Sequence, residues 1–425
     1  MDIIGAPEVW ETSTGGLSSN GDTIVIAMLD DGCRVNHPDL SDNIYRNYQE
    51  IPNNGIDDDN NGYVDDFKGL NVISGTDTHL SATHGTGVAG IIGAKGDNGI
   101  GVTGVNWNIK ILPITNMNFE AEVVEGYYYA LELRRKYNNT NGAEGAFIVT
   151  TNASFGIPTP VFCSEFQIWG AAYDSLGMEG IINIAATSNS NINVDEVGDM
   201  PSSCTSDFLI TVSNTDLDDE RVNSGYGKFS IDLAAPGKNS VTTRVSTFTG
   251  ESTYGVLGGT SAATPHVAGA VALLYSMPCT DLSTQAILDP ANTALAMKSI
   301  ILNGVEPLPV LEEISVTGGR LDLAKSVEGV RAFCNSESGA LNIDKITPNP
   351  VTSAMTIDFT TPNDSDYTFS IYNTLGQLIF TEEVSVQPFG SNRHTIDFKN
   401  SVANGVYFLT IENADDINSA TFVAF

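Results

Sequence analysis

Residues 23–32 read TIVIAMLDDG, a continuous apolar run with a β-branched start that ends in two aspartates and a glycine. A short apolar run that ends in this way is typical of a buried parallel strand that leads into a loop. Similar runs follow at 109–114, 146–150, 180–186 and 208–212. Helical patterns lie between them at 88–94, 123–135 and 166–177. This alternation predicts an α/β fold with a doubly wound, mostly parallel sheet, in which sites gather at the carboxyl ends of the strands.

The pattern changes after about residue 335. Residues 335–340 are a polar, Ser-rich connector, and the short stretches beyond it alternate apolar and polar residues with no helical period. These stretches are 355–359, 367–372, 377–382, 394–398 and 406–411. They predict a small all-β sandwich as a C-terminal domain. Since a single core rarely exceeds about 250–300 residues, we expect a domain at 1–334, a linker at 335–340 and a β domain at 341–425.

Charge and hydropathy exclude two classes of function. The chain has 19 Lys and Arg against 52 Asp and Glu, a formal net charge of −33. Nucleic-acid binding needs basic patches and is therefore not expected, whereas acidity suits solubility outside the cell and cation binding. No apolar run reaches the roughly 18 residues that a membrane span needs.

The cysteines and the first residues of the chain indicate the cellular compartment in which the protein folds. Five cysteines leave at least one thiol free, and we expect the pairs Cys163–Cys204 and Cys279–Cys334, with five buried thiols in a reducing compartment as the alternative. The start has neither a basic n-region nor an apolar h-region. The protein is therefore either cytosolic or has lost an N-terminal portion.

Three local signals supply the parts of a nucleophilic site. A hydroxyl nucleophile needs a base, a group that orients the base, and donors for the developing oxyanion. Asp30 ends the first strand, His84 begins the run HGTGVAG (84–90), and Ser261 lies in GTSAATPHVAG (259–269) just before an apolar helix. Taken singly, each has a structural explanation: a turn-forming Asp, a structural His and a Ser that caps a helix.

In the order Asp, His, Ser, these segments resemble those of the subtilisin-like serine proteases, and the resemblance extends over about residues 3–330. It implies that Ser261 is the nucleophile, His84 the general base and then acid, and Asp30 the orienting carboxylate. The family's oxyanion Asn ends an Ala-Ala-x-Gly-Asn stretch, which here is AATSN (185–189). Asn189 therefore matches although a Ser replaces the Gly, and Asn191 is a weaker candidate.

The same resemblance locates substrate-binding residues. Ser154, Phe155 and Gly156 match the segment that pairs with extended substrate and forms a wall of the S1 pocket. Asp31, where most subtilases have Ser or Thr, resembles the kexin branch, which cuts after paired basic residues. Residues 157–160 (IPTP) carry no charge where kexins have acidic residues. We therefore predict no dibasic specificity. We expect Asp31 to favour Lys or Arg at the substrate position before P1, with the alternative that Asp31 faces solvent or pairs with Arg34 and is screened.

An acidic loop at 54–66 reads NGIDDDNNGYVDD. Asp57, Asp59 and Asn61 place oxygen ligands on alternate residues, as at the start of an EF-hand loop, with the carbonyl of Tyr63 and the side chain of Asp65 as further ligands. The pattern predicts structural Ca²⁺, which subtilases commonly use. The alternative is a solvated acidic loop.

In the last part of the chain, ITPNP (346–350), IYNTLGQ (371–377) and GVYF (405–408) resemble the sorting domains of the type IX secretion system. A binding module for carbohydrate or protein and a stabilising appendage are the alternatives. We therefore expect a secreted or cell-surface monomer that cleaves protein or peptide substrates through an acyl-enzyme and meets the secretion machinery through this domain. The other hypothesis is a non-catalytic binding or adhesion protein on a subtilase scaffold.

Overall fold

The computed structural model describes residues 1–337, 341–352, 354–361, 366–385, 390–397, 403–413 and 416–424. The chain forms two compact units, Met1–Val330 and Arg331–Phe425. The division falls within helix α9 (Leu323–Glu337), so the predicted connector at 335–340 begins as helix. Residues 338–340 of that connector lie outside the described residues.

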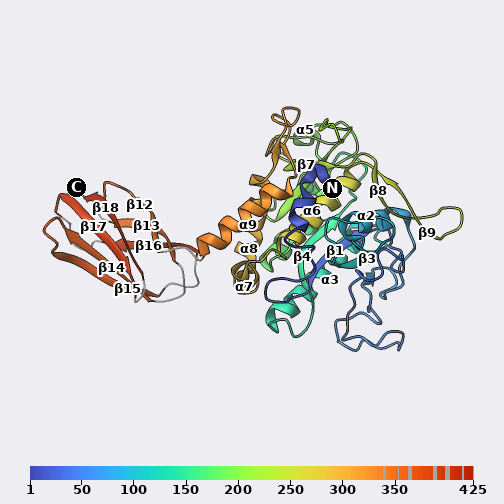
Figure 1. Ribbon diagram of the computed structural model, residues 1–425, viewed down its shortest axis with the longest axis horizontal. Coiled ribbons are helices and arrows are strands. Elements are labelled where there is room, and N and C mark those ends of the chain that lie inside the picture. Colours follow the sequence, from blue (N-terminus) through green and yellow to red (C-terminus); the bar gives the residue numbers. More distant parts are fainter. Residues whose placement is uncertain are drawn as a thin grey trace. The chain divides into compact units, whose positions relative to one another are not determined.

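The N-terminal unit is built on a nine-stranded sheet with the order β10-β11-β7-β6-β5-β4-β1-β3-β2. Figure 1 labels β7, β4, β1 and β3 of this sheet. The strands are β1 (Ile24–Asp30), β2 (Leu70–Asn71), β3 (Lys110–Thr115), β4 (Phe147–Ala153), β5 (Ile182–Ala186), β6 (Leu209–Thr215), β7 (Leu233–Pro236), β10 (Glu306–Pro307) and β11 (Gly319–Arg320). Every neighbouring pair is parallel except β10 with β11. All seven residues of β1 are buried, which explains its unbroken apolar run.

Helices cover both faces of this sheet, as the alternating pattern predicts. The longer ones are α2 (Thr83–Gly93), α3 (Glu120–Asn139), α4 (Gln167–Met178), α6 (Thr260–Leu274), α7 (Thr280–Leu288) and α8 (Pro290–Asn303). Helices α2 and α6 pack against each other and against the sheet on one face, and α3, α4 and α8 cover the other. Short helices α1 (Ala6–Trp10) and α5 (Val194–Val197) and the hairpin β8–β9 (Ser240–Val245, Ser252–Leu257) complete the unit.

The C-terminal unit consists of antiparallel strands in two sheets, ordered β12-β13-β16 and β15-β14-β17-β18. The strands are β12 (Asn342–Thr347), β13 (Ala354–Thr361), β14 (Asp366–Asn373), β15 (Leu378–Ser385), β16 (Gly390–Asp397), β17 (Gly405–Glu412) and β18 (Ile417–Ala424). Burial alternates strictly along β13, the period of 2 that one buried sheet face produces. The predicted fold class, an α/β domain with a small all-β domain, is confirmed. Strands β12 and β18 were not predicted, and Phe398, the predicted end of one strand, lies outside the described residues.

Candidate active site

Asp30 and His84 meet at the carboxyl end of β1. The Nδ1 atom of His84 lies 2.7 Å from Oδ1 of Asp30, whose side chain is 2% exposed. Because an ionised carboxylate can only accept hydrogen bonds, Nδ1 carries the hydrogen and Nε2 keeps its lone pair. The side chain of His84 is 34% exposed, so a substrate can reach the imidazole.

The small residues after His84 allow α2 to approach the end of β1. A Cβ added to Gly85 would lie 2.0 Å from the carbonyl oxygen of Gly32 and 2.9 Å from Cβ of Asp30. Any side chain at Gly85 would therefore push α2 away and separate the imidazole from its carboxylate.

Ser261 lies in the first turn of α6, where the sequence predicted it. Its hydroxyl donates to the carbonyl of Ser154 at 3.0 Å, and the hydroxyl of Ser154 donates back to the carbonyl of Ser261 at 3.1 Å. This reciprocal pair joins the start of α6 to the segment after β4, which is the neighbour of β1 in the sheet. Among the described residues no hydrogen bond joins Ser261 to His84, and such bonds are often long in enzymes without substrate.

Asn189 is held with its amide nitrogen free. Its Oδ1 accepts the backbone N–H of Thr260 at 2.9 Å and the hydroxyl of Thr260 at 3.2 Å, so the side chain is anchored beside the start of α6. Within the described part of the chain, neither Nδ2 of Asn189 nor the backbone N–H of Ser261 donates to another group. Asn191, the weaker candidate, accepts a hydrogen bond from Arg221 and is not among the residues that line a cavity with Ser261, whereas Asn189 is. Two donors next to the Ser261 hydroxyl are what an oxyanion requires.

Burial and charge shift the pKa values of the Asp–His pair. Burial raises the pKa of Asp30 to about 6, although the hydrogen bond and charge of His84 oppose it. Burial lowers the pKa of His84, but the hydrogen bond to Asp30 and the charges of Asp30 and Asp31 outweigh burial and leave this pKa above its ordinary value. The raised pKa makes the imidazole a stronger base than an ordinary histidine, which suits a group that takes up and returns a proton.

Two neighbouring cavities share the wall formed by residues 155–158. One, of about 160 Å³, is also lined by Ser154, Asn189 and Ser261. The other, of about 480 Å³, is also lined by Asp30, Asp31 and His84. The predicted substrate-binding segment thus borders both the cavity lined by the proposed nucleophile and the cavity lined by the proposed base.

Asp31 is exposed and faces the second cavity. Its carboxylate accepts the backbone N–H of Gly85 at 3.0 Å. Arg34, which the sequence offered as a screening partner, instead donates to Ser252 at 2.7 Å and to the carbonyl of Gly250. The charge of Asp31 is therefore open to a substrate.

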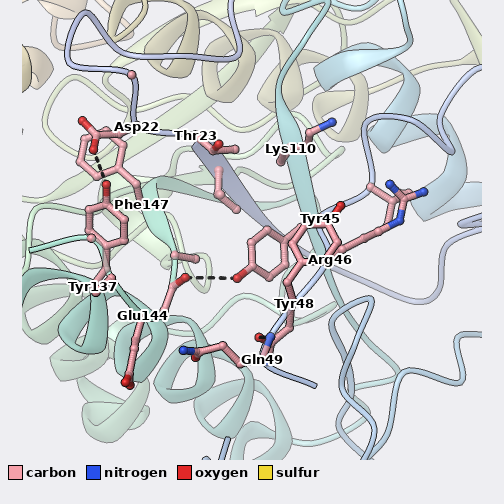
Figure 2. Close-up of a pocket in the computed structure, with 18 residues that line it drawn as sticks. Asp22, Thr23, Tyr45, Arg46, Tyr48, Gln49, Lys110, Tyr137, Glu144 and Phe147 are labelled. Atoms are coloured by element: carbon pink, nitrogen blue, oxygen red, sulfur yellow. Dashed lines mark hydrogen bonds between the residues drawn. The ribbon is translucent and has the colours of Figure 1, made fainter. Parts of the chain in front are cut away.

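A larger cavity, of about 580 Å³, lies at the opposite, amino-terminal ends of β1 and β4 (Figure 2). Figure 2 shows the hydroxyl of Tyr137 directed at the carboxylate of Asp22, and that of Tyr45 directed at the carbonyl of Gly145. The residues that line this cavity do not include a serine or cysteine nucleophile with a histidine base beside it. Size alone therefore does not identify the site, which lies at the other edge of the sheet, as expected for such folds.

The acidic loop brings three carboxylates together. Ligand atoms of Glu50, Asp57 and Asp59 all lie within 4.8 Å of one another, and the group can hold a metal ion. The Oε2 atom of Glu50 is buried without a hydrogen-bond partner, which a cation would supply. Lys136 forms an ion pair with one of the three carboxylates, with Nζ 3.8 Å from Oδ2 of Asp59.

The remaining predicted ligands are arranged differently. Asp65 accepts the backbone N–H groups of Asn54 and Gly55, at 2.9 Å and 3.0 Å, and does not belong to the group of three carboxylates. The Oδ1 atom of Asn61 accepts the N–H of Tyr63 at 2.8 Å. Sequence reasoning missed Glu50, because it lies outside the acidic run, and folds back to accept the N–H groups of Asp58 and Asp59.

The odd number of cysteines predicted at least one free thiol, and the structure agrees with this prediction. Cys163 is bonded to Cys204, which confirms that pair, and Cys279 and Cys334 are also disulfide-bonded. In the described part of the chain Cys33 is the free thiol, and it is buried.

The fold and this arrangement define a class: an α/β protein with a serine, a histidine and a buried aspartate at the carboxyl edge of its sheet. Comparison with known proteins gives the family. The subtilase family matches residues 21–306, so the chain belongs to the subtilases. Residues 345–424 match the secretion system C-terminal sorting domain, which indicates secretion or attachment at the cell surface. No described helix has the length and apolarity to cross a membrane.

Individual relatives are about a quarter to a third identical to this chain over the aligned residues. Subtilisin-like protease 1 of Plasmodium vivax is 30% identical over 327 residues, 71% of this chain and 46% of the relative. The major intracellular serine protease of Bacillus subtilis is 28% identical over 65% of this chain and 74% of its own length. The chain spans about half the length of the first of these curated relatives. A protease structure from Pseudoalteromonas arctica has a TM-score of 0.54 at 24% identity, covers 77% of this chain and 94% of its own, and supports the fold.

Proposed function

We propose that this chain is a serine endopeptidase that cleaves protein or peptide substrates through an acyl-enzyme. The observation that carries the proposal is the hydrogen bond from His84 to the buried Asp30, beside a cleft wall shared with Ser261. Membership of the subtilase family and relatives named serine proteases support it.

In the proposed mechanism, Nε2 of His84 takes the proton of the Ser261 hydroxyl as Oγ attacks the substrate carbonyl carbon. The hydroxyl first leaves its hydrogen bond to the carbonyl of Ser154. Asp30 keeps the ring in the reactive tautomer and stabilises the imidazolium. The oxyanion accepts hydrogen bonds from Nδ2 of Asn189 and the N–H of Ser261. His84 then returns its proton to the leaving amine, and water hydrolyses the acyl-enzyme by the reverse sequence.

The test is peptide hydrolysis by wild-type protein and by Ser261→Ala. We expect the variant to lose nearly all hydrolysis while it keeps its melting temperature, since no neighbouring group replaces Oγ. Ser276→Ala is the matched control, a buried serine just beyond the other end of α6, and it should retain activity. Substantial hydrolysis by Ser261→Ala would favour another nucleophile, and no hydrolysis by the wild-type protein would favour the non-catalytic scaffold hypothesis.

We further propose that the acidic loop binds structural Ca²⁺. Glu50, Asp57 and Asp59 would hold the ion, with the side-chain oxygen of Asn61 and the carbonyl of Tyr63 available as additional oxygen ligands. The ion would supply positive charge that balances three adjacent carboxylates. These residues would stabilise the loop rather than take part in hydrolysis, because the loop is separate from Ser261 and His84.

For the C-terminal unit we propose that the sorting domain engages the secretion machinery and that the peptidase acts as a monomer. The subtilase match ends at residue 306, and the match to the sorting domain begins at residue 345. This gap supports domains at 1–334 and 341–425 with a connector between them. Deletion of 341–425 should abolish export while purified protein still hydrolyses peptides, and light scattering should give the mass of one chain.

A further inference from the structure

The cavity beside Ser261 carries one charged side chain. Its lining comes from Ser154 to Pro158, Ala186 to Asn189, Asp199, Thr260 and Ser261. Among these described residues Asp199 alone is charged. Drug-sized ligands usually occupy about 300–1,000 Å³, so a cavity of about 160 Å³ is suited to a single substrate side chain.

One oxygen of Asp199 is fully used by the protein. Its Oδ2 accepts the backbone N–H of Ser188 at 2.9 Å and the hydroxyl of Thr187 at 3.0 Å. The hydroxyl of Ser202 donates to the same oxygen. All three donors are neutral, so they fix the carboxylate in place without cancelling its charge.

The other oxygen of Asp199, Oδ1, accepts no hydrogen bond from the described residues. No described Lys or Arg forms an ion pair with this carboxylate either. Although the residue is 5% exposed, Oδ1 is not among the enclosed polar atoms without a partner, so it keeps contact with the cavity. A buried charge without a counter-ion is unfavourable, and a cation in the cavity that Asp199 lines would supply one.

The wall that carries Asp199 is rigidly placed. The backbone N–H of Ile157 donates to the carbonyl of Met200 at 2.8 Å, which joins this wall to the substrate-binding segment. The N–H of Ser203 donates to the carbonyl of Asp199 at 2.7 Å, and the disulfide Cys163–Cys204 ties the same turn to the loop after β4. A substrate side chain would therefore meet the carboxylate at a fixed position.

We propose that Asp199 selects Lys or Arg at P1, the substrate residue whose carbonyl Ser261 attacks. This inference rests on the proposed peptidase function. Because Ser261 and Asn189 both line the cavity, a residue with its carbonyl at these groups directs its own side chain into the cavity. Its ammonium or guanidinium donates to Oδ1 in a charge-assisted hydrogen bond.

This site is separate from the other acidic groups near the substrate. Asp31 and Glu120 line the neighbouring cavity of about 480 Å³ and are absent from the lining of this one. Residues 157–160 contain no acidic residue. The acidic residue of this cavity, Asp199, comes from about forty residues further along the chain.

The test uses peptides that differ only at P1, with arginine, its neutral analogue citrulline, or leucine, and alanine at P2. We expect wild-type kcat/KM to favour arginine over citrulline by about 10–100-fold, the range for a hydrogen bond to a charged group. In Asp199→Asn, which keeps one oxygen to accept the three donors, this ratio should fall to near one. Asp174→Asn, which removes an exposed carboxylate elsewhere on the same unit, should keep the wild-type ratio.

If Asp199→Asn does not fold, inhibition of the wild-type enzyme tests the role of Asp199. Benzamidine, a cation, should inhibit competitively at least tenfold better than the neutral benzamide. A wild-type enzyme that cleaves the peptides but treats arginine and citrulline alike would overturn the role of Asp199 while leaving the peptidase function standing. A protein that cleaves no peptide and is not labelled by a fluorophosphonate would overturn both.

Discussion

Two groups in this chain bring three potential ligand atoms within 4.8 Å: Asp30, Asp31 and His84, and Glu50, Asp57 and Asp59. The first contains its own base, an imidazole hydrogen-bonded to a carboxylate at the end of a buried strand. The second consists of carboxylates alone, on the irregular chain between β1 and β2. Proximity is the same in both, but the chemistry of the groups differs. An imidazole can take up and return a proton, whereas three carboxylates with Lys136 near one of them keep negative charge that a bound cation would balance.

The largest expected effect tests the first group. His84→Ala should lower kcat by about 10⁶-fold, the scale found for triad loss in subtilisin, and Ser261→Ala added to it should cost little more because the triad acts as a unit. Steady-state hydrolysis of one peptide by the single and double variants measures this. Multiplicative losses would contradict a shared mechanism, and a similar loss in Asp57→Asn would remove the contrast between the two groups.

The next effect concerns the transition state. Asn189→Ala should lower kcat by about 10²–10³-fold with little change in KM, a range that derives from subtilisin itself. Asn191→Ala is the matched control, since Asn191 does not line the cavity that Ser261 and Asn189 share. A change in KM alone would assign Asn189 to substrate binding.

The second group should respond to metal removal through stability. Ca²⁺ at a hundredfold excess over Kd stabilises the folded state by about 2.7 kcal/mol. A chelator should therefore lower the melting temperature while turnover at modest temperature changes little. Glu50→Gln should lower the melting temperature and weaken its response to the chelator. A melting temperature that the chelator leaves unmoved would show that the loop is only an acidic surface.

The smallest effect concerns pH and Asp31. His84 acts as a base only when neutral, so kcat/KM should rise with pH through its raised pKa, with a midpoint above the ordinary 6.5 of histidine. The charge of Asp31 contributes to that raised pKa, so Asp31→Ser should move the midpoint to lower pH. The same variant should lose a preference for Lys over Glu at P2 of less than about tenfold, because exposed charge pairs contribute little. Identical pH and P2 profiles would leave Asp31 without a role in either.

The sequence predicted what short motifs encode. The buried strand that ends in Asp30, the small residues after His84 and the turn before α6 each constrain their own backbone, and the structure places them at one edge of the sheet. The period of 2 likewise predicted the C-terminal domain.

The rest depends on contacts between distant segments. Glu50 joins the acidic loop only because the chain folds back on itself. Asp65 was predicted as a ligand by spacing alone, yet its carboxylate accepts N–H groups at the start of the loop. Asp199 reaches the cavity beside Ser261 through a turn held by a disulfide, and no local pattern marks it.

The central claim is that His84 activates Ser261. Intact-mass measurement after treatment with a fluorophosphonate, followed by peptide mapping, tests it most directly. We expect one label per wild-type chain, on Ser261, and almost none on His84→Ala at the same exposure. A label elsewhere, no label, or equal labelling of the two proteins would contradict the account.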